Sequence, residues 1–148
     1  MSDNHETHVL NSLIETVIDS SDGYRKAGEA AENSRFKTLF LERVRMRSEL
    51  ARKLQAEVRH LGGTPDEDGT VLAKAHRTFL ALKDTVTGRD DKAVITEVER
   101  GESFIKGKFD AAVKEGGLSP QTKHVIEAGR IEIRAQHEQV TALKNAIS

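Results

Sequence analysis

Apolar residues recur every three or four positions along four long stretches of the chain, and this spacing predicts amphipathic helices. Together with the breaks between the stretches, the pattern predicts five helices, at about residues 7–31, 35–61, 70–86, 90–115 and 120–147. No stretch alternates apolar and polar residues as a half-buried strand does. The sequence therefore predicts an all-α fold.

The breaks between the helices indicate how they are connected. Gly62 and Pro65 end the second helix, because glycine accepts a left-handed cap and proline cannot continue a helix. Ser119 and Pro120 give the last helix a hydroxyl N-cap and a proline at its first position. Tight turns make the first two and the last two helices antiparallel pairs, and the long segment 62–89 carries the short fifth helix. Two hairpins joined by one long crossover form the ferritin-like type of four-helix bundle.

Polar residues interrupt the apolar stripes at a common height. In the crossover topology, Arg47, Glu102 and Glu132 each lie roughly 18–24 Å from the same end of the bundle. Ser21 on the first helix lies at that height, and Gln136 lies one turn away. Because a buried charge needs a partner, we expect Arg47 to bridge the two glutamates in an internal polar layer.

Such a layer has two interpretations. An arginine with two glutamates at the centre of a bundle is most often a structural network, and the alternative is a metal or substrate site. Glu132 is the least central of the three, since it lies roughly 60° off the middle of its stripe. Arg43 also falls on the inner face of the second helix. Gly101 and Gly129, beside the layer, are expected to let the last two long helices approach closely.

Composition narrows the function classes. A chain of 148 residues is long enough for one domain, 1–148, in which we expect residues 1–6 to be frayed. The net charge of -1 gives no general attraction to nucleic acid, and the absence of cysteine excludes disulfides and thiolate metal sites. No signal peptide and no apolar run of about 20 residues is visible. We therefore expect a cytoplasmic protein with no nucleic-acid or membrane partner.

Three segments of the chain resemble a known group of proteins. They are residues 54–63 (LQAEVRHLGG), 76–77 (HR) and 99–102 (ERGE). These segments are similar to those of uncharacterised bacterial four-helix-bundle proteins of the ferritin-like superfamily, and the likeness extends over about residues 9–143. The resemblance implies the fold and a bacterial origin. The family is a domain of unknown function, so the resemblance implies no reaction.

The wider superfamily often binds two iron or manganese ions through glutamates and Glu-x-x-His motifs. This sequence lacks the pair of Glu-x-x-His motifs that the pattern requires, since only Glu57 and His60 have that spacing, and Arg47 would place a cation where the charge of a metal belongs. We therefore expect the dimetal site to be lost, with an internal salt bridge in its place. If a metal site survives, its nearest ligand set is Glu99, Glu102, Glu132 and His137.

Three functions follow from these observations. The favoured hypothesis is a non-catalytic bundle that forms a homodimer or binds a protein partner and needs no cofactor. The alternative is a divergent oxidase or iron-binding protein that holds iron or manganese. The third is a ligand-binding bundle in which Arg47 holds a carboxylate or phosphate in the core.

Overall fold

The computed structural model describes residues 2–68 and 90–147, with side chains described from residue 5 onward. These residues form the helices α1 (Ser2–Ala30), α2 (Ser34–His60), α4 (Asp91–Val113) and α5 (Pro120–Ile147), and the described part of the chain contains no strand. The prediction of an all-α protein is confirmed. The short helix predicted at 70–86 lies outside the described residues.

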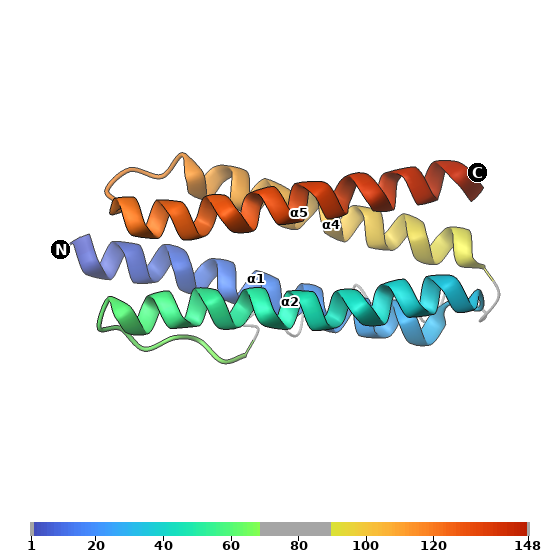
Figure 1. Cartoon of the computed structure of the whole chain (residues 1–148), viewed down its shortest axis with the longest axis horizontal. Coiled ribbons are helices and arrows are strands. Elements are labelled where there is room, and N and C mark those ends of the chain that lie inside the picture. Colours follow the sequence, from blue (N-terminus) through green and yellow to red (C-terminus); the bar gives the residue numbers. More distant parts are fainter. Residues whose placement is uncertain (1, 69–89, 148) are drawn as a thin grey trace.

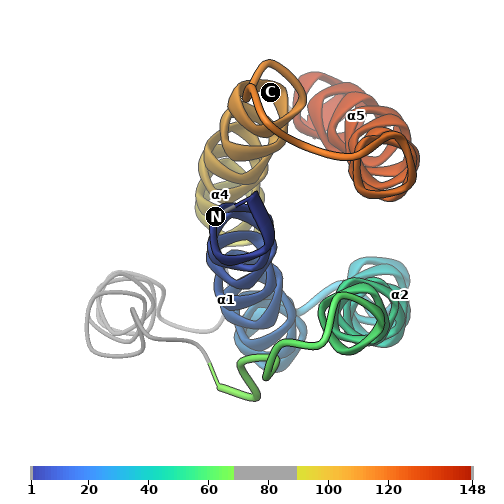
Figure 2. The same ribbon diagram turned by 90° about the vertical axis from the view of Figure 1, so that its left-hand side faces the viewer.

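Helices that follow one another within each hairpin run antiparallel, and the two hairpins stack against each other (Figures 1 and 2). α1 packs on α2 and α4, while α5 packs on α4 and α2. At one end, Asp91 accepts hydrogen bonds of 2.8 and 3.0 Å from the backbone N–H groups of Glu32 and Asn33. At the other end, Gly63 lies against Thr7. The end of α2 and the start of α4 therefore lie at opposite ends of the molecule (Figure 1).

Side chains and glycines fix the ends of the helices. Asn33 and Asp90 accept hydrogen bonds from backbone N–H groups two and three residues later, at 2.8 and 3.1 Å, and so cap α2 and α4. Gly62 and Gly117 follow α2 and α4 with φ of +82° and +79°, a left-handed conformation that other residues rarely adopt. The turns that separate the helices thus form for local reasons.

α1 begins earlier than the polar N-terminus led us to expect. Glu6 is buried, and its carboxylate accepts a hydrogen bond from the backbone N–H of Ser119. Glu57 is also buried and accepts a hydrogen bond of 3.1 Å from Thr122. Both carboxylates lie at the N-terminus of α5, where the helix dipole favours negative charge. The contact of Glu6 attaches α1 to the start of α5, and the contact of Glu57 attaches α2 to it.

The inward faces of the helices form two apolar clusters. One fills the end of the bundle where α1 begins and includes Leu10, Leu54 and Phe109. The other fills the opposite end around Phe40 and Val140. Both clusters follow the predicted apolar stripes. None of the described helices combines the length and apolarity that crossing a membrane requires.

Gly101 and Gly129, which were both expected to lie between α4 and α5, have different environments. A Cβ on Gly129 would lie 2.9 Å from a ring carbon of Phe109 and 3.2 Å from Leu50, so only glycine fits there without displacement of its neighbours. A Cβ on Gly101 would meet nothing within 4 Å, and the residue is exposed. The expectation of close packing therefore holds at Gly129 and is wrong at Gly101, which lies on the outward face of α4.

Candidate functional site

A polar layer lies between the two apolar clusters, and each described helix contributes one residue to it. Its members are Ser20, Arg47, Glu102 and Gln136. The exposed fractions of Arg47, Glu102 and Gln136 are 0%, 1% and 4%. Each of these three takes an inward position within an apolar stripe, so helix packing carries it into the interior.

Arg47 is held by acceptors on three other helices. Its Nη1 and Nη2 atoms donate to Oε1 and Oε2 of Glu102 at 2.8 and 2.7 Å, which is the bidentate geometry of a strong ion pair. Nη1 also donates to the Ser20 hydroxyl at 2.6 Å. Oε1 of Gln136 accepts from Nε at 3.2 Å and from Nη2 at 2.8 Å. A guanidinium carries five N–H groups, so each of those on Arg47 has an acceptor.

The charge of Arg47 is fixed over the physiological pH range. Burial lowers the pKa of Arg47, but the Glu102 carboxylate, together with Tyr24 and Glu132, outweighs burial and raises that pKa above its ordinary value. Burial, and then the charge of Glu102, raise the pKa of Tyr24, whose ring centroid lies 5.3 Å from the Arg47 guanidinium carbon. Arg47 therefore remains a cation and Tyr24 a neutral phenol.

Ser21 lies beside the layer but bonds elsewhere. Its hydroxyl donates to the backbone oxygen of Val44 and shares a hydrogen bond with Ser48, both at 3.2 Å. Ser21 therefore ties α1 to α2, while the preceding residue, Ser20, reaches Arg47. The two serines lie about 100° apart around the helix, and this difference in direction decides which one meets the guanidinium.

Glu132 does not take the place expected for it. It is half-buried and is not among the groups that hydrogen-bond Arg47, although its charge contributes to the raised pKa of that arginine. Gln136, one turn further along α5, is 4% exposed and accepts two hydrogen bonds from Arg47 instead. The bridge to two glutamates is thus corrected to one glutamate and one glutamine. The reason is that Glu132 lies off the centre of the inward face.

The four residues considered as metal ligands do not converge; they are Glu99, Glu102, Glu132 and His137. Glu99 accepts hydrogen bonds from Lys144 at 2.8 Å and Thr141 at 2.9 Å, and these two contacts lower its pKa. His137 lies 3.1 Å from the hydroxyl of Ser103 in an exposed position. Among the described residues, no group of three or more histidine and acidic side chains is arranged to hold a metal ion.

The chemistry of the layer also does not fit the dimetal site of the wider superfamily. Both carboxylate oxygens of Glu102 already accept hydrogen bonds from Arg47. Metal ions between the helices would lie beside a guanidinium that keeps its positive charge. The acceptors present at this height suit an arginine and not a cluster of divalent cations.

A second buried arginine, Arg43, lies one turn before Arg47 and is only 2% exposed. Its Nη2 atom donates to Gln139 Oε1 at 2.8 Å, and its guanidinium carbon lies 5.7 Å from the centroid of the Tyr24 ring. Its Nε and Nη1 atoms are buried and have no hydrogen-bond partner among the described residues. The sequence placed Arg43 on the inner face. Because residues four apart lie on the same face of a helix, its spacing from the buried Arg47 also indicated a second buried cation.

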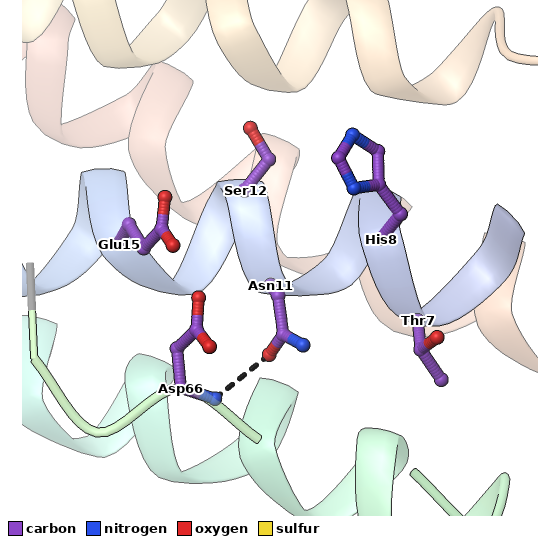
Figure 3. Close-up of a pocket in the computed structure, with 6 residues that line it drawn as sticks. All are labelled: Thr7, His8, Asn11, Ser12, Glu15 and Asp66. Carbon is purple, nitrogen blue, oxygen red and sulfur yellow. Dashed lines mark hydrogen bonds between the residues drawn. The ribbon is translucent and has the colours of Figure 1, made fainter. Parts of the chain in front are cut away.

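A polar hollow of about 430 Å³ lies on the surface of α1 beside the segment that follows α2 (Figure 3). Oδ1 of Asn11 accepts a hydrogen bond of 2.8 Å from the backbone of Asp66, and the Asn11 amide donates to the Thr64 oxygen at 3.2 Å. Gln55 donates to the Asp66 oxygen at 2.9 Å. These bonds attach the segment to α1 and α2, so we read the hollow as part of that attachment.

One family model matches the chain, over residues 5–115, and its description is a domain of unknown function (DUF2383). The predicted resemblance to an uncharacterised domain family is therefore confirmed. Arg47 and Glu102 fall within the matched range, whereas Gln136 lies beyond it. No functionally curated protein matches the chain.

Proposed function

The chain belongs to the DUF2383 family of domains of unknown function, and we propose that it is a non-catalytic bundle of the ferritin-like type. In this proposal the polar layer occupies the height at which metal-binding bundles of that type hold their ions. The layer keeps four helices in register, and the outer surface carries the function through self-association or a protein partner.

The path of the chain supports the ferritin-like type. Each hairpin is antiparallel, and the end of α2 and the start of α4 lie at opposite ends of the molecule (Figure 1). A long crossover between two hairpins is what distinguishes this type from a simple up-and-down bundle.

The non-catalytic assignment rests on one observation, namely that the hydrogen-bonding groups of Arg47 are all used within the layer. Each N–H group of this residue has an acceptor, and both oxygens of its partner Glu102 are occupied. Acid–base catalysis needs a group that gains or loses a proton near neutral pH, and a guanidinium does neither. A buried, satisfied ion pair instead favours one arrangement of helices over others, which is a structural role.

The alternative, an iron- or manganese-binding protein, needs carboxylates and a histidine that converge. Glu99 is engaged by Lys144, and His137 lies beside Ser103. A metal in the layer would also have to displace Arg47 from Glu102, which costs the energy of a buried ion pair. These contacts count against the alternative.

Metal analysis of the purified protein tests the proposal. Protein from cells grown with added iron and manganese is expected to contain far less than one metal ion per chain. Stoichiometric metal that is lost in Glu102→Ala but kept in Glu97→Ala would reject the proposal. Glu97 is a matched control, because it lies on α4 as well but pairs with Arg100 near the surface.

Sedimentation over a range of concentrations tests the surface role. Phe104 and Ile131, on α4 and α5, are large apolar residues with exposed fractions of 61% and 59%, and such residues favour burial against a partner. We expect Phe104→Ser and Ile131→Ser to weaken a homodimer more than Leu41→Ser on α2. A chain that sediments as a monomer at every concentration would contradict self-association and leave a different protein as the partner.

A further inference from the structure

In the described part of the bundle, one buried arginine takes part in no ion pair. Arg43 and Arg47 are 2% and 0% exposed, and one buried carboxylate, that of Glu102, lies in their part of the interior. Arg47 occupies both oxygens of that carboxylate. No ion pair within the described ranges 2–68 and 90–147 involves Arg43, because the adjacent Glu42 is exposed and pairs with Arg45.

The other acids near the interior do not remove this imbalance. Asp19 is half-buried on α1, but its pKa is raised by burial and by the charge of Asp22, and no ion pair joins it to Arg43 in the described structure. Glu132 is half-buried, and its charge acts on Arg47. The buried Glu6 and Glu57 lie far along the bundle, at the N-terminus of α5. A guanidinium keeps its proton in proteins, and an unpaired charge in the interior is strongly destabilising. Arg43 therefore requires a negative partner from outside the described side chains.

Two of the nitrogen atoms of Arg43 have N–H groups that are available to bind such a partner. Its Nη2 atom donates to Gln139, whereas Nε and Nη1 are buried without an acceptor. The Tyr24 ring lies 5.7 Å from the Arg43 guanidinium, so the unpartnered N–H groups of Arg43 lie in the region of this ring.

We propose that Arg43 binds a small monovalent anion inside the bundle, between α2 and α5, of the size of a halide or formate. The anion accepts hydrogen bonds from the free N–H groups and neutralises the surplus charge. Nε and Nη1 have almost no solvent-accessible surface, so the anion must be small and neighbouring side chains must move to admit it. Gln139 is exposed, so movement of its side chain opens a route from solvent. This site is separate from the Arg47–Glu102 pair and does not depend on the proposed function.

Tyr24 provides a direct reporter. The chain has one tyrosine and no tryptophan, so its intrinsic fluorescence comes from the ring that lies beside Arg43. The purified full chain is titrated with sodium formate and with sodium bromide, at an ionic strength held constant with sodium sulfate. We expect a saturable change in Tyr24 emission, and a thermal midpoint that rises with the logarithm of the anion concentration.

Two methionine variants separate binding at Arg43 from general salt effects. Arg43→Met is expected to lose the saturable response, with an affinity roughly tenfold or more weaker, because charge-assisted hydrogen bonds disappear. Arg45→Met is the matched control on the same helix, since Arg45 is exposed and pairs with Glu42 and Glu49, and it should keep the response. An equal response in both variants, or none in the native chain, overturns the proposal.

A crystallographic measurement keeps the test decisive if Arg43→Met does not fold. Crystals of the native chain grown in bromide are expected to show an anomalous scattering peak within hydrogen-bonding distance of Arg43 Nε or Nη1. A water molecule at that position, with no bromide signal, would overturn the proposal.

Discussion

Replacement of Glu102 by glutamine tests the polar layer most directly, because it removes the charge and keeps the size of the side chain. Glu102 accepts two hydrogen bonds from Arg47, and charge-assisted bonds of this kind contribute about 1.5–3 kcal/mol each. The variant leaves a buried guanidinium without its counter-ion and turns an amide N–H toward it. Breaking a buried pair from one side costs about 3–5 kcal/mol, in agreement with the sum from the hydrogen bonds.

Chemical unfolding followed by circular dichroism measures this loss as a change in the free energy of unfolding. In a domain of this size, 3–5 kcal/mol corresponds to a fall of about 6–20 °C in the thermal midpoint. Glu49→Gln is the control, because Glu49 and its partner Arg45 have side chains that are 50% and 56% exposed. Exposed pairs of this kind contribute at most about 1 kcal/mol.

The double variant Arg47→Met/Glu102→Leu shows whether the two residues act as a pair. It removes both charges, so we expect it to be more stable than either Glu102→Gln or Arg47→Met alone. Ser20 and Gln136 lose their donor in the double variant, and this limits the recovery. If the losses of stability in the two single variants add up in the double variant, or if Glu102→Gln is as stable as the control, the conclusion that the pair is buried and coupled is refuted.

Three further predictions concern other positions. Gly129→Ala should lower the free energy of unfolding by about 1–3 kcal/mol, because its Cβ would lie 2.9 Å from a core ring, whereas Gly101→Ala should raise it by about 0.5–1 kcal/mol; thermal denaturation distinguishes the two signs. Burial, and then the charge of Asp22, raise the pKa of Asp19 from 3.8 to about 6, so the folded chain keeps this proton longer than the unfolded chain. The contribution of Asp19 to the free energy of unfolding therefore falls as the pH rises from 3.8 to about 6. Urea unfolding of Asp19→Asn at several pH values should lack this decline. Asp91→Ala should speed hydrogen exchange in the α1–α2 turn, because the turn loses two acceptors; unchanged exchange there would contradict the role of Asp91.

Much of the fold could be predicted from local rules. The stripe of Leu10, Leu13 and Ile14 is buried as expected, because a helix brings such positions to one face whatever it packs against. Gly62 and the turn at Asn33 end and begin α2 where the conformational preferences of these residues require it. The burial of Arg47 and Glu102 was likewise predictable, since both lie within apolar stripes.

The contacts within the layer depended on the tertiary structure. Ser20 and not Ser21 binds Arg47, and Gln136 and not Glu132 completes its shell, because a few tens of degrees of helix rotation decide which side chain reaches the guanidinium. The pairing of Arg47 with Glu102 also leaves Arg43 without an acid. Periodicity along one helix specifies which face is buried. The partner of each buried charge is decided only when four helices take their positions, since it depends on distances between side chains on different helices.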